Sequence, residues 1–217
     1  MDFERARFNM VEQQVRPWDV LDQDVLESMM TVKREEFVPA AHRALAFSEA
    51  EIPLGFGQVM VSPVIEGKVL QALALKPTDS VLEIGAGSGY FAALLASRAD
   101  WVRSIEIEPE LAALASANLK AAGVENAVVE EGDGSDGWPS RAPYDVIVVS
   151  GGMPELPASL KAQLKVGGRL FAFIGEAPMM VGRLVTCIGE GQYESVDVFE
   201  NVVPALRNAR RADAFRF

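Results

Sequence analysis

Three glycines that alternate with other residues form the motif with the clearest chemical meaning. The stretch VLEIGAGSGY places Gly85, Gly87 and Gly89 between an apolar segment and a predicted helix. Because glycine has no side chain, a ligand can closely approach the backbone N–H groups of such a turn. A dinucleotide-binding turn needs a small residue where this sequence has Tyr90, which disfavours NAD and FAD. Taken alone, the motif is explained equally well by a purely steric role of its glycines.

Two acidic residues follow the ends of later predicted strands. Glu106, in SIEIEPEL, ends the next strand, where a carboxylate can accept hydrogen bonds from both hydroxyls of a ribose. Asp133, in EGDGSDGW, could receive an adenine amino group while Gly134 gives the ring room, although Asp is also common in turns. The carboxyl ends of parallel strands meet at one edge of an α/β sheet. We therefore expect the glycine turn, Glu106 and Asp133 to converge on one nucleoside-bearing ligand.

The elements that must position these residues are those of a doubly wound, Rossmann-like α/β fold. The run VIVV in the fourth strand is apolar throughout, which is typical of a parallel sheet covered on both faces. GRLVTCIG and ESVDVFENVV predict antiparallel strands at the C-terminal edge. Parallel strands are expected at residues 80–84, 101–107, 127–130, 145–150 and 169–174. Helices are expected at residues 65–75, 90–99, 109–122 and 157–164, with a turn at 165–168.

The N-terminal part has a different pattern. Apolar residues within the first 45 positions recur at three- and four-residue spacing, which predicts helices, and Pro17 divides them into two. The segment EIPLGFGQVMVSP contains two Gly and two Pro, so it predicts an extended loop or hairpin able to cover a site. We expect one domain over residues 1–217, with N-terminal helices and a substrate loop in 1–64 and a cofactor-binding core in 65–217.

Charge and composition exclude several classes of function. A net charge of −11 argues against a broad basic face, so a nucleic-acid partner is not expected. No apolar run reaches the roughly 18 residues of a membrane-spanning helix. A single cysteine, Cys187, and a charged N-terminus without a signal sequence favour the cytoplasm. One histidine and no clustered acidic ligands predict no metal site. Four arginines in 207–216 accompany Asp213 and apolar residues, which predicts a solvated tail.

Beyond the alternating glycines, which resemble the first motif of class I S-adenosylmethionine-dependent methyltransferases, four stretches carry a closer likeness. They are MVEQQVRP with VLESMMTVKREEFVP, IPLGFGQ, VLEIGAGSGY, and EGDGSDGWPSRAPYDVIVVSGGMPELP with LKVGGRL. Through them the sequence resembles the protein-L-isoaspartate O-methyltransferases over nearly its full length. The resemblance implies S-adenosyl-L-methionine as cofactor and methylation of the α-carboxyl group of L-isoaspartyl residues in damaged peptides and proteins, so that a succinimide can re-form.

The resemblance also implies a set of cofactor-binding positions. An acceptor carboxylate is already ionised near neutral pH, so catalysis would depend mainly on alignment of the reacting atoms and exclusion of water. The residues expected to bind the cofactor are Gln58, Glu83, Gly85, Ala86, Gly87, Ser88, Gly89, Glu106, Asp133 and Gly134.

The substrate loop GQVMVSP departs from the family pattern. Members typically carry Thr and Ser hydroxyls where this sequence has Val59 and Val61, which leaves Ser62 as the candidate catalytic hydroxyl. A shift of one residue along an extended segment points a side chain to the opposite face. Val59, Met60 and Val61 either line an apolar pocket or are simply buried. The acceptor is accordingly an isoaspartyl carboxylate or a more apolar group, and a third alternative is a non-catalytic module that binds the cofactor.

Overall fold

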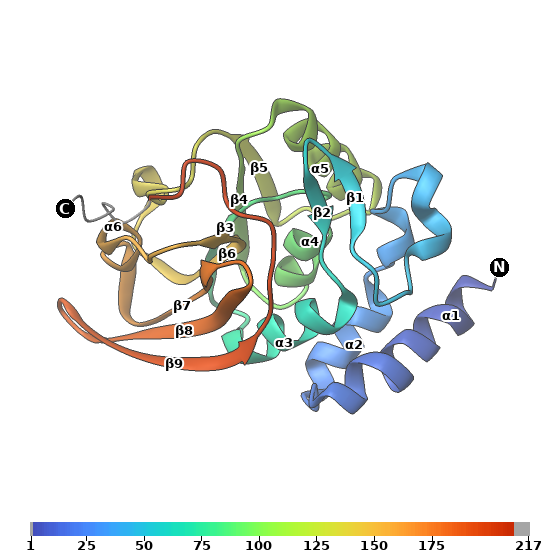
Figure 1. Cartoon of the computed structure of the whole chain (residues 1–217), viewed down its shortest axis with the longest axis horizontal. Helices are drawn as coiled ribbons and strands as arrows, with labels where there is room; N and C mark the ends of the chain where they lie inside the picture. Colours follow the sequence, from blue (N-terminus) through green and yellow to red (C-terminus); the bar gives the residue numbers. More distant parts are fainter. Residues whose placement is uncertain (1, 211–217) are drawn as a thin grey trace.

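A seven-stranded sheet forms the centre of the computed structural model, which describes residues 2–210 (Figure 1). Its strands are β3 (Ser80–Ile84), β4 (Trp101–Glu106), β5 (Ala127–Glu131), β6 (Tyr144–Met153), β7 (Leu164–Glu176), β8 (Met179–Gly189) and β9 (Gln192–Glu200). They lie in the order β5-β4-β3-β6-β7-β8-β9. The first five strands pair in parallel, and β8 and β9 pair antiparallel at the edge. The predicted Rossmann-like sheet with antiparallel strands at its C-terminal edge is therefore confirmed.

The chain reverses its direction of growth across the sheet between β3 and β6. It builds β3, β4 and β5 toward one edge and then returns to place β6 on the other side of β3. Crossovers on the two sides of this point leave a crevice at the carboxyl ends of the central strands, where open α/β sheets bind ligands. The fold thus places the glycine turn after β3 at that crevice.

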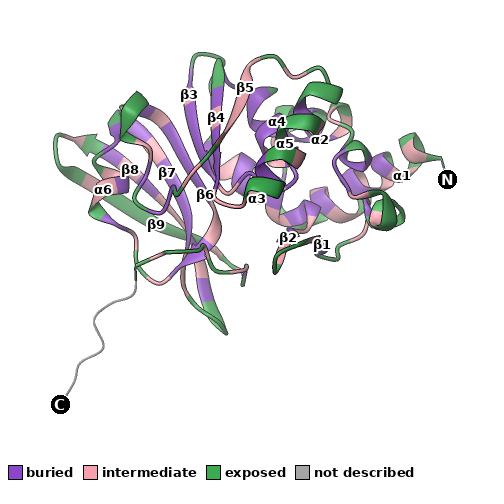
Figure 2. Cartoon of the chain, turned by 90° about the horizontal axis from the view of Figure 1, so that it is seen from above, coloured by how far each residue is buried: buried purple, intermediate pink, exposed green. Residues whose placement is uncertain are grey.

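Helices cover the two faces of the sheet unequally. On one face, α3 (Pro63–Leu73), α4 (Tyr90–Ala96) and the N-terminal helices share a core with the inward side chains of β3, β4, β6 and β7. The other face is covered by the short helix α6 (Ala158–Lys161) and by loops. Figure 2 shows the helical layer on one side of the sheet, with buried residues gathered between the two layers. The α5 helix (Pro109–Ala121) packs on the helical side beside α4.

The predicted N-terminal helices are present, and two 3-10 helices, Arg34–Glu36 and Ala40–Leu45, follow them. Helix α1 (Phe3–Met10) continues through a π-helical turn and a 3-10 turn to Trp18, and α2 covers Gln23–Thr31. The Asp2 and Asp22 side chains accept hydrogen bonds from the first turns of α1 and α2. The side-chain amide of Gln71 on α3 accepts from Leu21 N–H and Asp22 N–H, at 2.7 and 2.9 Å. These bonds fix the N-terminal helices to the first helix of the α/β core.

The predicted hairpin before α3 is present. β1 (Ile52–Gly55) and β2 (Gln58–Met60) pair antiparallel, separately from the main sheet. The hairpin lies over the glycine turn, because a Cβ added to Gly87 would lie 3.2 Å from Leu54 Cδ1. The substrate loop expected from the sequence therefore covers the expected cofactor turn.

Two local predictions differ from the structure. The turn predicted at residues 165–168 lies within β7, because Leu164 already pairs with Tyr144 before a register shift restores pairing at Arg169. The helix predicted at 157–164 is shorter and covers only Ala158–Lys161. Both differences arise because pairing with β6 begins earlier than the apolar pattern indicates.

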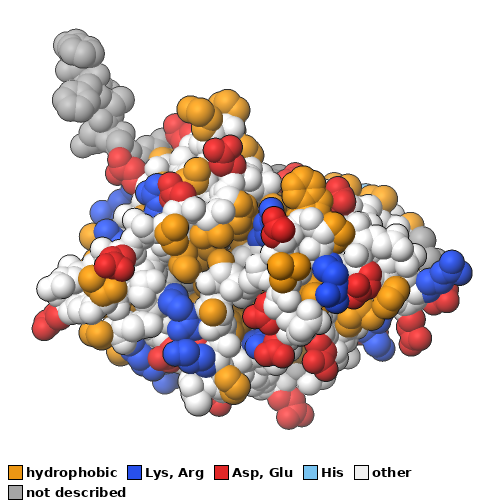
Figure 3. All heavy atoms as spheres, turned by 90° about the horizontal axis from the view of Figure 1, so that it is seen from below, with side chains coloured by type: hydrophobic (Ala, Val, Ile, Leu, Met, Phe, Trp, Pro, Cys, Tyr) orange, Lys and Arg blue, Asp and Glu red, His pale blue; other side chains and the backbone are white. Residues whose placement is uncertain are grey.

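The surface shows mixed charges. In the view of Figure 3, Lys and Arg side chains are interspersed with Asp and Glu, and hydrophobic side chains gather toward the middle of the face. Over residues 2–210, none of the helices combines the length and the apolar character required to cross a membrane.

Gly89 provides a test of the packing between α4 and α5. Its φ of +82° and the 3.0 Å approach of an added Cβ to the Ala115 carbonyl oxygen both oppose a side chain. Gly123 has a φ of +71° but no atom within 4 Å of an added Cβ. We expect Gly89→Ala to destabilise the protein by about 1–3 kcal/mol more than Gly123→Ala, because it adds overpacking to the backbone strain. Urea unfolding measures the free energy of unfolding of both variants. An equal decrease in the two variants would contradict the packing role of Gly89.

Candidate active site

A cleft of about 1050 Å³, including its open mouth, lies at the carboxyl ends of β3, β4 and β6. Its walls are the glycine turn, the residues after β4, the loop after β5, the β1–β2 hairpin and the segment after β9. That last segment crosses the carboxyl ends of the strands in Figure 1 and is bonded to the end of β6, with Leu206 N–H donating to the Gly152 carbonyl at 2.7 Å. Segments far apart in the sequence therefore form one site.

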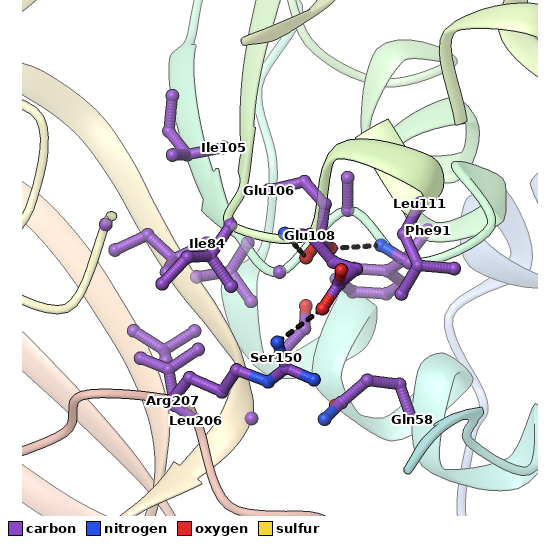
Figure 4. A pocket seen from close by; sticks show the side chains of 18 of the residues that line it. Gln58, Ile84, Phe91, Ile105, Glu106, Glu108, Leu111, Ser150, Leu206 and Arg207 are labelled. Atoms are coloured by element: carbon purple, nitrogen blue, oxygen red, sulfur yellow. Dashed lines mark hydrogen bonds and ion pairs between the residues drawn. The ribbon is translucent and has the colours of Figure 1, made fainter. Parts of the chain in front are cut away.

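Glu106 joins the glycine turn to the end of β4. One of its carboxylate oxygens accepts the Gly87 N–H at 2.9 Å, and the other accepts the Glu108 N–H at 3.0 Å. The residue is only 6 % exposed. Because each carboxylate oxygen has more than one lone pair, both can still accept from a ligand hydroxyl. The carboxylate is thus held in place and directed into the cleft (Figure 4).

The glycine turn supplies much of the cleft floor. Gly85 and Gly87 have φ values of +96° and +54°, which other residues rarely adopt. The Ser88 carbonyl accepts from Asn118 Nδ2 at 2.9 Å, which ties the turn to α5. Gly85, Ala86, Gly87 and Ser88 line the cleft, whereas Gly89 does not and packs against α5 instead.

The loop after β5 forms the next wall. Asp133 Oδ1 accepts the Ser135 N–H at 2.9 Å, and Oδ2 accepts from Asn208 Nδ2 at 2.8 Å. Partial burial alone would raise the pKa of Asp133, but these hydrogen bonds outweigh it and lower the pKa. Gly134 lies so close to the sheet that an added Cβ would be 2.9 Å from Ile84 Cγ2. The loop therefore presents an ionised carboxylate beside a flat stretch of backbone.

Glu83 lies outside the cleft, unlike Glu106 and Asp133, the other acidic residues of the predicted site. It is fully buried in β3, accepts a hydrogen bond from Ser104 Oγ on β4, and leaves Oε1 without a partner. Burial raises the pKa of Glu83 to about 8, against the lowering effect of the Ser104 hydrogen bond. The structure thus places this carboxyl group within the protein interior, below the glycine turn rather than against a ligand.

The substrate loop lines the cleft with apolar groups. Gln58, Val59, Met60 and Val61 all contribute to its wall. Ser62 does not: it precedes α3, and its backbone carbonyl accepts from the N–H groups of that helix. The structure therefore brings no hydroxyl of this loop to the place that the family pattern would require.

A buried arginine that the sequence analysis overlooked holds this loop. Arg34, which is 0 % exposed, donates to the Val61 carbonyl at 2.7 Å and forms an ion pair with Glu66, a residue of the cleft wall. Its guanidinium also lies 4.8 Å from the centre of the Tyr90 ring. In the sequence Arg34 lies in a run of four charged residues between Val32 and Phe37, which gave no sign that its side chain is buried.

Arg207 is a second overlooked residue. The sequence predicts a solvated tail from 207 to 216, but Arg207 lines the cleft, pairs with Glu108 and donates to the Phe56 carbonyl at 3.1 Å. Arg207 is exposed, as the prediction implies, but it is not part of a free tail, because the hydrogen bonds to β6 carry the chain back over the site. Residues 211–216 of the predicted tail lie outside the described residues.

Fold and cleft together define a class I methyltransferase. The chain changes direction across the parallel sheet between β3 and β6, and the glycine turn after β3 is bonded to Glu106, the carboxylate that ends β4. The family described as "Protein-L-isoaspartate(D-aspartate) O-methyltransferase (PCMT)" matches residues 6–201. The chain belongs to this family, and it is an S-adenosylmethionine-dependent methyltransferase.

Named relatives cover most of the chain. The protein-L-isoaspartate O-methyltransferase of Methylorubrum extorquens is 40% identical over 213 residues, covering 98% of this chain and 93% of the relative. Protein-L-isoaspartate O-methyltransferase 1 of Rhodopseudomonas palustris is 48% identical over 183 residues, covering 84% and 74%. A Plasmodium falciparum protein solved with S-adenosyl-L-homocysteine aligns with a TM-score of 0.78 at 18% identity, covering 95% of this chain and 99% of that one. This last likeness shows the fold alone.

The buried carboxyl group of Glu83 predicts a characteristic dependence of stability on pH. Burial raises its pKa from 4.5 to about 8, so the folded state binds this proton more tightly than the unfolded chain does. The contribution is therefore favourable below pH 4.5 and declines as pH rises toward 8, by at most about 1.4 kcal/mol per pH unit. We expect Glu83→Gln to remove this decline. Urea unfolding of both proteins between pH 5 and 8 measures it, and parallel curves would refute it.

Proposed function

We propose that the cleft binds S-adenosyl-L-methionine and that the protein transfers its methyl group to the α-carboxylate of L-isoaspartyl residues in peptides and proteins. Family membership supports this proposal. The observation that carries it is the Glu106 carboxylate, held by the glycine turn at 2.9 Å and directed into a cleft between the cofactor turn and the substrate hairpin.

The residues that line the cleft fit this cofactor. Glu106 would accept hydrogen bonds from the ribose hydroxyls, because its two oxygens retain lone pairs after bonding the backbone. The backbone of Gly85 and Gly87 allows close approach of the rest of the ligand, and Asp133 and Gly134 would hold the adenine. When bound, the cofactor supplies an electrophilic methyl group on a positively charged sulfur. Glu83 does not line the cleft, so it would support cofactor binding by holding the glycine turn in place rather than by contacting the cofactor.

The chain's own residues align the acceptor and exclude water. An acceptor carboxylate is ionised at neutral pH, so one oxygen forms the new O–C bond while the C–S bond breaks and its electron pair remains on sulfur. No proton moves in this step, so a general base is not needed. His42, the chain's single histidine, does not line the cleft, in agreement with this chemistry. Leu54, Val59 and Val61 would shield the reacting atoms from solvent.

We further propose that residues 1–217 act as one domain in the cytoplasm. One apolar core joins Met10 and Val15 of the N-terminal helices to Phe171 of β7, which supports the first part. The buried, unpaired Cys187 supports a reducing compartment.

A methylation assay tests the proposed function. We expect transfer to a peptide with one L-isoaspartyl residue, and none to its L-aspartyl twin. Equal transfer to both peptides, or to neither, would refute the isoaspartyl proposal.

A binding measurement tests the role of Glu106. We expect Glu106→Gln to weaken binding of S-adenosyl-L-homocysteine by about tenfold or more, because it removes charge-assisted hydrogen bonds. Glu110→Gln, on the exposed first turn of α5, is the matched control and should bind normally.

The two valines of the substrate loop allow a gain-of-function test. Val59 and Val61 line the cleft, so Thr and Ser at these positions would place hydroxyl donors where an acceptor carboxylate would lie. We expect the double variant Val59→Thr with Val61→Ser to lower KM for the isoaspartyl peptide by about threefold to tenfold, the effect of one or two hydrogen bonds. Steady-state kinetics measure it. An unchanged KM would show that these positions do not contact the acceptor.

A further inference from the structure

Arg207 is the one cationic residue of the cleft wall among residues 2–210. Four acidic residues line the same cleft, namely Glu66, Glu106, Glu108 and Asp133. Glu66 is paired with the buried Arg34, but the other three carboxylates repel an anionic acceptor unless a positive group is placed to receive it. The charge distribution of the wall therefore singles out Arg207.

The contacts of Arg207 hold it at the mouth of the cleft without exhausting its donors. Nη1 pairs with Glu108 after β4, and Nη2 donates to the Phe56 carbonyl at the tip of the hairpin, at 3.1 Å. A guanidinium has five N–H groups, so several remain for a third partner. The side chain is 43 % exposed, and ion pairs at that exposure add little to stability. Stability alone therefore does not account for this arrangement.

The surroundings of the guanidinium match a carboxylate. Figure 4 shows Arg207 and the side-chain amide of Gln58 directed toward the same part of the cleft, with Glu106 beyond them. Val59 and Val61 also line the cleft, and they offer no side-chain donors. Among the described residues, the charged donor available to an anion in this region is Arg207.

We infer that Arg207 binds the α-carboxylate of the methyl acceptor and supplies the recognition that the valines of the substrate loop lack. This inference rests on the proposed function. One oxygen of the acceptor accepts a guanidinium N–H, and the other oxygen is left free to attack the methyl carbon. The Glu108 pair and the Phe56 bond keep the guanidinium oriented before the acceptor binds, which lowers the entropic cost of binding.

The carboxylate of the methyl donor is the competing ligand for the same guanidinium, and the test separates the two. The two test variants are Arg207→Gln and Arg207→Lys. The matched control is Arg210→Gln: Arg210 lies on the same segment as Arg207 but outside the cleft, and its substitution removes an exposed ion pair with Asp136. Calorimetry in the presence of S-adenosyl-L-homocysteine gives the Kd of two unreactive complexes, with the isoaspartyl peptide and with its α-carboxamide analogue. Binding of S-adenosyl-L-homocysteine alone reports on folding and on the donor site.

In the unaltered protein we expect the carboxylate peptide to bind at least tenfold more tightly than the carboxamide, about 1.4 kcal/mol. In Arg207→Gln the ratio of the two peptide Kd values should fall to near one, and in Arg207→Lys it should be intermediate. The Kd of S-adenosyl-L-homocysteine should agree within twofold among the unaltered protein and the three variants. An unchanged ratio in Arg207→Gln would overturn the inference. A loss of affinity in the Arg207 variants for S-adenosyl-L-homocysteine alone would also overturn it, because Arg207 would then bind the carboxylate of the methyl donor. Absence of methylation by the unaltered protein would instead overturn the proposed function, and this inference with it.

Discussion

The hydrogen bonds that the Glu106 carboxylate accepts from Gly87 and Glu108 are the interaction on which the site depends. They join the end of β4 to the turn after β3, so two separate strand ends become one rigid surface. A carboxylate bonded to two backbone N–H groups and 6 % exposed is already oriented before a ligand arrives. A ribose that binds there does not have to order the carboxylate, and the affinity it gains is correspondingly larger.

A buried polar network supports the other wall of the cleft. The Arg34 guanidinium bridges the Val61 carbonyl and Glu66, and it stacks on the Tyr90 ring at the start of α4. Such a buried pair is weak as a source of stability, because desolvation offsets most of the attraction, but loss of one partner leaves a costly unpaired charge. Its structural consequence is positional. It fixes the end of the substrate loop to α3, the helix that follows it, and to the helical layer below the glycine turn.

Local patterns in the sequence determined the elements and the cofactor turn, and tertiary contacts determined the rest. The short, mostly apolar segment before the glycines predicted β3 at its observed bounds, and the alternating glycines predicted the turn that Glu106 joins. Glu83 shows the limit of a motif. Side chains alternate along a strand, and because Ile84 faces the cleft, Glu83 faces Ser104 and the interior instead. Arg207 could not be predicted, since its partners Phe56 and Glu108 are remote in sequence and are reached only after the chain has crossed the sheet.

The apolar substrate loop and the single arginine make sense together once the charge change of the reaction is considered. Methyl transfer from a sulfonium to a carboxylate converts a cation and an anion into two neutral products. A low-dielectric environment favours that loss of charge, because it destabilises the separated ions more than the transition state. Val59 and Val61 therefore favour the chemical step while giving the acceptor little binding energy. Hydroxyls in their place would add binding but would also solvate the attacking oxygen. A guanidinium at the mouth of the cleft, bonded to one oxygen of the acceptor, supplies binding while the other oxygen stays among apolar side chains.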